Sequence, residues 1–290
     1  MQSQDNTLNG IGLLIISTFF FAAQDAITKH LIETLSVFQI VTIRFFFFAL
    51  FAIVYAARRT EHHSWFRSAN PVLQISRSLL ITAEICVFAV TIQHMGLAEM
   101  HTVFACFPLL ITALSMPLLG EDVGWRRWLA VCAGFLGTLI IIRPGLGVFN
   151  PWSLAAFLAA LMFALYNILT RKVSQRDPFE TSLLYFGVVG FLGSLVFALF
   201  TWRQPDGMET ILLLTISVTA IIGHLCLIKA LELAPAVILQ PFNYFVLVWA
   251  IVLGYLLFGE ILDPVSLTGA AIVVASGVFI ARREYRLKYS

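Results

Sequence analysis

Ten apolar stretches, each about as long as a helix that crosses a membrane, dominate this 290-residue sequence. A helix needs roughly 20 residues to cross about 30 Å of hydrocarbon. Charged residues, prolines, glycines and tryptophans separate the stretches. They cover residues 8–30, 37–57, 72–93, 99–119, 128–142, 152–170, 181–201, 209–231, 236–258 and 265–281. The sequence therefore predicts an all-α polytopic membrane protein with ten transmembrane helices.

The composition favours lipid as the surrounding medium. Only 12% of the residues are charged and 60% are hydrophobic, whereas soluble domains keep about a quarter of their residues charged. The net charge of +2 is too small to indicate a nucleic-acid partner. The four cysteines form no CxxC pair and no Cys/His spacing typical of zinc. We therefore expect no metal site, no cofactor and no disulfide framework.

The basic residues give the ten spans a direction. If both termini lie in the cytoplasm, thirteen of the 18 basic residues fall on the cytoplasmic side and three on the other. An excess of Lys and Arg in cytoplasmic loops is the rule for such proteins. We therefore expect a multi-pass protein of the plasma membrane, in a bacterium the inner membrane, with both termini cytoplasmic.

The two halves of the sequence resemble each other. The segment FAAQDAITK at 21–29 matches FALYNILTR at 163–171, an offset of 142 residues. A second match is a Leu-Ala pair before one span and a Gly-Glu pair after it. It occurs at 97–98 with 120–121, and again at 233–234 with 259–260. The sequence therefore predicts two five-helix repeats, residues 1–143 and 144–290.

Because five is odd, successive repeats must enter the membrane from opposite sides. Inverted repeats are typical of secondary transporters, which bind substrate in a central cavity near the bilayer midplane. An enzyme is disfavoured because the sequence has no GxSxG, no HExxH and no phosphate-binding glycine loop. A channel is disfavoured because the spans have too few polar residues for a continuous polar path. The pattern favours transport by alternating access.

Polar residues inside the spans are the candidate substrate-binding residues, because such groups are costly in hydrocarbon. Glu84 lies near the centre of the third span, two helical turns from Arg77 on the same face. It is either a carboxylate that binds substrate or carries a proton, or one member of a structural ion pair with Arg77 or Arg44. Arg44 lies in the second span, where it can neutralise a carboxylate of the protein or of the substrate.

The ninth span carries Gln240, Asn243 and Tyr244 at i, i+3 and i+4, which places two amides and a phenol on one helical stripe. Amides both donate and accept hydrogen bonds, as a substrate with amino and carboxylate groups requires. Tyr166 and Asn167 in the sixth span, the repeat counterparts of Gln24 and Asp25, are candidates of the same kind. For all of them the alternative role is hydrogen bonding between helices.

Two histidines complete the candidate site. His101 in the fourth span and His224 in the eighth either couple transport to protons or act as neutral hydrogen-bonding groups. Glu121 and Glu260 are expected to cap or orient helix ends, outside the substrate site. Pro108 in the fourth span is expected to permit bending.

These features together resemble the drug/metabolite transporter superfamily, specifically the EamA-type permeases and their branch of amino-acid and aromatic-metabolite exporters. The resemblance rests on the two five-helix halves, Arg44-Phe45, the segment from Pro108 to Gly120-Glu121, and Gly259-Glu260. The second half departs from this pattern. Its proline lies early in the ninth span, in Gln240-Pro241, and not at the mid-span position that matches Pro108.

The resemblance implies ATP-independent export of small amphipathic metabolites. Amino acids of broad range, including aromatic ones, are the first expectation. Nucleosides, toxic cations or other drugs are the alternatives, and a channel is a weaker one. The expected partners are a small-molecule substrate and membrane lipid, and the expected state is a monomer or a weak homodimer.

Overall fold

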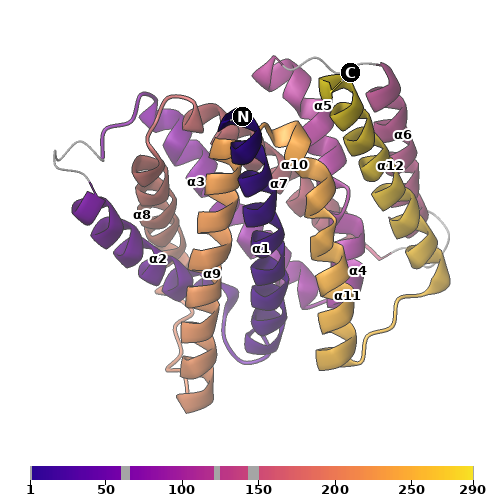
Figure 1. Cartoon of the computed structure of the whole chain (residues 1–290). Helices are drawn as coiled ribbons and strands as arrows, with labels where there is room; N and C mark the ends of the chain where they lie inside the picture. Colours follow the sequence, from indigo (N-terminus) through magenta and orange to yellow (C-terminus); the bar gives the residue numbers. More distant parts are fainter. Residues whose placement is uncertain (1, 60–65, 121–124, 143–149, 290) are drawn as a thin grey trace.

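The computed structural model describes residues 2–59, 66–120, 125–142 and 150–289. The described residues form twelve α-helices and no strands (Figure 1). The helices are α1 Gln2–Leu31, α2 Val37–Arg59, α3 Pro71–Ile92, α4 Leu97–Phe104, α5 Phe107–Leu119, α6 Trp125–Ile142, α7 Trp152–Ser174, α8 Phe179–Ala198, α9 Gly207–Leu233, α10 Ala236–Asn243, α11 Phe245–Phe258 and α12 Pro264–Tyr289.

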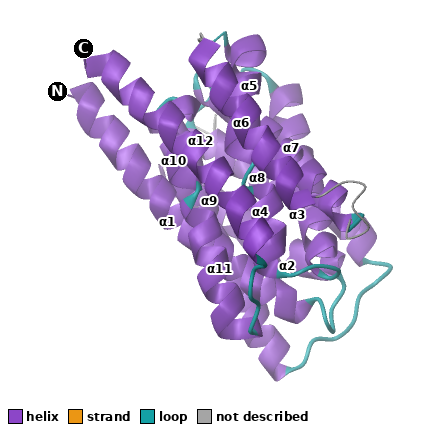
Figure 2. Cartoon of the chain, turned by 90° about the vertical axis from the view of Figure 1, so that its right-hand side faces the viewer, coloured by secondary structure: helices purple, strands orange, loops and turns teal. Residues whose placement is uncertain are grey.

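The predicted all-α polytopic class is confirmed. Eight of the predicted spans correspond to one helix each, and two correspond to helix pairs, α4 with α5 and α10 with α11. Within the described residues, seven spans are long and apolar enough to cross a membrane, with α4 and α5 counted as one, and shorter apolar helices accompany them. α1 begins and α12 ends at the same end of the bundle, as an even number of crossings requires (Figures 1 and 2).

The two interrupted spans break at corresponding places. The first is interrupted at Ala105 and Cys106, and α5 then starts with Pro108 in its first turn, where the missing N–H removes no helical hydrogen bond. The second is interrupted at Tyr244, although it has no proline at the position matching Pro108. Both spans end at a left-handed glycine, Gly120 with φ 71° and Gly259 with φ 64°.

The packing of the helices is symmetric between the halves. α1 packs against α9 as α7 packs against α3, and α1 contacts α11 as α7 contacts α5. α2 with α8, and α6 with α12, form the two flanks (Figure 1). Exchanging each helix for its counterpart therefore reproduces the main contacts. The division into two repeats stays a prediction. The boundary itself, at residues 143 and 144, lies outside the described residues.

Small residues let the flanking helices approach closely. A Cβ atom on Gly187 of α8 would lie 2.8 Å from the Cα atom of Ala49 on α2. A Cβ atom on Gly137 of α6 would lie 2.9 Å from the carbonyl oxygen of Gly269 on α12. These contacts agree with the general use of glycine at helix interfaces in membranes.

Candidate functional site: a polar cavity inside the bundle

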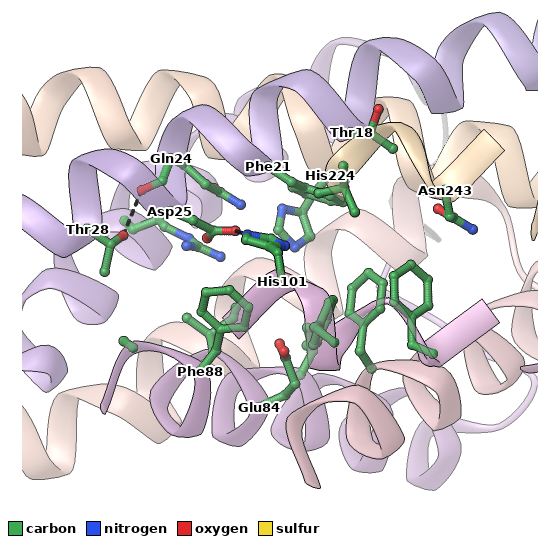
Figure 3. A pocket seen from close by; sticks show the side chains of 18 residues that line it. Thr18, Phe21, Gln24, Asp25, Thr28, Glu84, Phe88, His101, His224 and Asn243 are labelled. Atoms are coloured by element: carbon green, nitrogen blue, oxygen red, sulfur yellow. Dashed lines mark hydrogen bonds and ion pairs between the residues drawn. The ribbon is translucent and has the colours of Figure 1, made fainter. Parts of the chain in front are cut away.

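A cavity lies inside the bundle, and nine of the twelve helices contribute to its wall (Figure 3). Most of its wall comes from the first half of the chain, and α7, α9, α10 and α11 close it from the second half. Its polar lining consists of Thr18, Gln24, Asp25, Thr28, Arg44, Glu84, His101, His224 and Asn243. Its aromatic lining consists of Phe21, Phe88, Phe104, Phe107 and Phe163.

The position of α1 follows from its contact with α9. Ser17 Oγ donates a hydrogen bond of 2.8 Å to the carbonyl oxygen of Gly223, and a Cβ atom on Gly223 would lie 3.0 Å from the Phe21 ring. With α1 held this way, Phe21, Asp25 and Thr28 share one face at helical spacing and point into the cavity. One small residue on α9 thus orients the polar stripe of α1.

Asp25 and His101 are in direct contact in the lining of the cavity (Figure 3). His101 Nε2 lies 3.2 Å from Asp25 Oδ2, and the imidazole is 1% exposed. Neither ring nitrogen of His101 has a hydrogen-bond partner, because the Asp25 contact has the distance of an ion pair without hydrogen-bond geometry. Since buried polar atoms are normally hydrogen-bonded, the Nδ1 atom, which has no such contact, is available to a ligand.

Arg44 and Glu84 complete the charged lining, and each side chain is only 4% exposed. The Arg44 guanidinium lies close enough to Asp25 and Glu84 for charge attraction, and it faces the Phe45 ring at 5.9 Å. Arg77 does not pair with Glu84. Of the two arginines considered as ion-pair partners of Glu84, only Arg44 lies near it.

Arg77 belongs to a separate network that joins α3 to α7 and α8. Its guanidinium donates to Gln74 Oε1 at 2.7 Å, to Thr170 Oγ1 at 3.2 Å and to the carbonyl oxygen of Ser182 at 2.7 Å. Gln74 Nε2 in turn donates to Asp177 Oδ2 at 2.8 Å. These bonds give Arg77 a structural role away from the cavity.

Phenylalanine rings form a continuous apolar wall opposite α1. The Phe88 and Phe104 rings meet edge to face at 5.3 Å between centroids, and Phe104 lies 5.0 Å from Phe107. The Phe107 ring meets Phe163 at 4.9 Å and 90°. Because α3, α4, α5 and α7 all contribute, the wall spans both halves of the chain. The cavity thus combines charged groups with aromatic rings.

The cavity brings together four of the eight residues predicted for the substrate site. Glu84, His101, His224 and Asn243 all line it. His224 Nδ1 lies 3.2 Å from the carbonyl oxygen of Ala220, one turn earlier in α9. The His224 ring packs edge-on against Phe21 at 4.8 Å.

The other four predicted residues do not line the cavity or are not described. Asn167 Nδ2 donates 2.8 Å to the carbonyl oxygen of Phe163, and Tyr166 is fully buried against Arg77 and Phe186. Tyr244 occupies the break between α10 and α11, so the expected stripe does not continue through it. The side chain of Gln240 lies outside the described residues. Their binding roles stay predictions without support from this cavity.

Five polar residues of the cavity were not among the predicted site residues, namely Thr18, Gln24, Asp25, Thr28 and Arg44. The repeat match contained the signal for two of them, because Gln24 and Asp25 align with Tyr166 and Asn167. An aspartate within an apolar span is also rare in itself. Arg44 was considered only as a neutralising group, and its place beside both carboxylates fits that role.

A second cluster lies at the end of the bundle away from the chain termini. Glu260 Oε1 and Oε2 accept hydrogen bonds of 3.0 Å each from the backbone N–H groups of Leu97 and Ala98, and Lys29 forms an ion pair with the same carboxylate. Burial by itself raises the pKa of Glu260, but the Lys29 ammonium and the two N–H groups outweigh it and hold the pKa below its ordinary value. The predicted capping role of Glu260 is thus observed.

Comparisons with known proteins agree with this architecture. A solved structure superposes with a TM-score of 0.69 at 18% identity, over 96% of this chain and 97% of that one. The sequence is 28% identical to the S-adenosylmethionine uptake transporter of Rickettsia conorii, over 96% of this chain and 94% of that protein.

Two further relatives have different substrates. The pseudopaline exporter of Pseudomonas aeruginosa is 23% identical over 95% of this chain and 97% of its own length. The riboflavin transporter of Vibrio cholerae is 34% identical over 61% of this chain and 60% of its own length. The EamA-like transporter family matches residues 8–143 and 150–282. Since these matches cover nearly the whole sequence, the chain belongs to the EamA-like transporter family.

Proposed function

We propose that this protein is a secondary transporter that carries a small amphipathic metabolite through the central cavity by alternating access. The observation that carries the proposal is the set of charged groups, the buried Arg44 and Glu84 and the half-buried Asp25, in a cavity closed by both halves of the chain. Such groups are costly within a membrane and mark substrate or ion pathways. The symmetric packing of the halves supplies two equivalent arrangements, as alternating access requires.

Amino acids, including aromatic ones, are the substrates that we propose first. The cavity offers carboxylates and a guanidinium for the two charged groups of an amino acid, and phenylalanine rings for its side chain. The relatives named above transport three different metabolites, so nucleosides, toxic cations and other metabolites are the alternatives. Against a channel, five phenylalanine rings line the cavity, whereas a channel requires a continuous polar path.

Export is the proposed direction, and the bacterial inner membrane with both termini in the cytoplasm is the proposed location. The distribution of basic residues supports this orientation. A reporter enzyme that is active only in the cytoplasm, fused after Ser290, tests it. An inactive fusion of full length would contradict the orientation.

Transport into liposomes tests the proposed function. The purified chain is reconstituted, and uptake of a labelled amino-acid panel is measured against empty vesicles, with and without a proton gradient, and after preloading with unlabelled substrate. S-adenosylmethionine and riboflavin extend the panel. We expect saturable uptake of at least one amino acid. Uptake of S-adenosylmethionine or riboflavin without any amino acid would show that the amino-acid assignment is wrong. If no compound is taken up, the proposed transport function is wrong.

A further inference from the structure

The hydrogen-bonding groups of the cavity are unevenly divided between donors and acceptors. Asp25 and Glu84 are acceptors when ionised, and the buried Oε1 atom of Gln24 is an acceptor without a partner. Arg44 is the one cationic side chain among the lining residues of this cavity. Two carboxyl groups therefore face one guanidinium, and His101 and His224 add ring nitrogens that either donate or accept.

Glu84 is a carboxyl group of the lining that lacks hydrogen-bond donors among the described residues. Its side chain is 4% exposed and points from α3 into the cavity, facing α1 (Figure 3). Within the described part of the chain, no group donates a hydrogen bond to it, and Arg44 contributes only charge attraction. A buried carboxylate without donors is unfavourable. A ligand that brings N–H donors and a positive charge would relieve this.

The aromatic wall fits the remainder of the same ligand. The rings of Phe88, Phe104 and Phe107 border the space that Glu84 faces. Aromatic faces attract cations, and aromatic or aliphatic groups pack well against them. A ligand with a charged nitrogen on an apolar body thus contacts both kinds of lining residue at once.

We propose that the cavity selects substrates by a protonated amino group, which binds between Asp25 and Glu84 while the apolar part of the substrate lies on the phenylalanine wall. A carboxylate on the substrate, where present, pairs with Arg44 and strengthens binding without being required. This inference rests on the proposed function and deepens it. It separates molecules that differ at one nitrogen, because acetylation removes the positive charge and leaves the rest of the molecule in place.

Three matched compounds test the proposal on the unmodified protein: L-phenylalanine, phenethylamine and N-acetyl-L-phenylalanine. Binding to the purified full-length chain in detergent is measured as the shift in melting temperature over a millimolar titration. We expect L-phenylalanine and phenethylamine to bind, with the amino acid the tighter, and N-acetyl-L-phenylalanine to give no shift. Equal binding of the acetylated compound, or no binding of any of the three, would overturn the proposal.

Two isosteric variants test the residues. Glu84→Gln and Asp25→Asn each remove one carboxylate charge, and we expect each to weaken binding of phenethylamine by about tenfold or more. Glu33→Gln removes an exposed carboxylate in the turn after α1 and serves as the matched control. Unchanged affinity in both cavity variants would contradict the assignment. If one variant fails to fold, the other variant and the acetylated compound still test the proposal.

The liposome assay separates this proposal from the proposed function. If the chain transports a neutral or anionic compound and ignores all three phenylalanine derivatives, the selection by an amino group is wrong and the transporter assignment stands. If the chain transports nothing, the proposed function is wrong, whatever the binding titration shows.

Discussion

Replacing Glu260 by alanine is expected to destabilise the bundle by about 2 kcal/mol. Gly96, the residue before α4, has no side chain to cap the helix, and Glu260 of the other half supplies the cap instead. Loss of a helix cap costs about 1 kcal/mol. The ion pair with Lys29, whose two side chains are each 18% exposed, adds about 1 kcal/mol at most.

The assay is thermal unfolding in detergent, followed by tryptophan fluorescence, at a series of pH values. The pKa of Glu260 is lower in the folded protein, so its contribution is full above the ordinary carboxyl range and is lost as the pH falls through the lowered pKa. The difference in melting temperature between the parent and Glu260→Ala should therefore be largest at neutral pH and shrink in acid.

Two controls make the result specific. Glu33→Ala removes an exposed carboxylate at the same end of the bundle and should leave the melting temperature unchanged. Lys29→Met removes the ion pair alone and should cost less than Glu260→Ala. If Glu260→Ala melts with the parent at neutral pH, or if its deficit is as large in acid, Glu260 does not stabilise α4 through its charge.

Three further predictions concern packing and the cavity. Gly187→Leu should lower stability by about 1–3 kcal/mol because α2 and α8 must separate to make room for the side chain. Gly12→Ala should have little effect in the same melting assay, because a Cβ atom there would meet no atom within 4 Å. Equal effects of the two substitutions would contradict the packing described for Gly187. Asn243→Ala should slow liposome uptake severalfold, and Asn167→Ala should not, since only the first lines the cavity; the reverse order would move the site. Arg77→Leu should lower stability by about 3 kcal/mol or more, because it removes three hydrogen bonds and leaves the buried Gln74 Oε1 atom without its donor. A melting temperature within a degree of the parent would contradict this.

The sequence predicted the helices well because the thickness of the bilayer sets their length. The predicted spans over 37–57 and 152–170 begin at the same residues as α2 and α7. The interruptions at Cys106 and Tyr244 were not predicted in this form. Pro108 indicated bending in one half, whereas the other half has no proline at the matching position, and its Pro241 lies three residues before the break.

The candidate site was only half predictable. Glu84 and His101 were found because titratable groups are rare in hydrocarbon, and that signal needs no knowledge of the fold. Asn167 does not line the cavity, for a physical reason. Its amide donates to the carbonyl oxygen of its own helix, whereas its repeat counterpart Asp25 has no donor when ionised and faces the cavity. Side chains at equivalent positions of the two halves therefore differ in whether they can donate a hydrogen bond to their own helix.

The central claim is that one cavity opens alternately to the two sides of the membrane, and a cysteine in that cavity tests it most directly. Thr18 lines the cavity and is close to cysteine in size. Thr18→Cys, in a background without Cys86, Cys106, Cys132 and Cys226, is treated with a membrane-impermeant thiol reagent in intact cells and in inside-out vesicles. The account predicts labelling from both sides, slowed by transported substrate. Labelling from one side only, whatever the substrate, would contradict it.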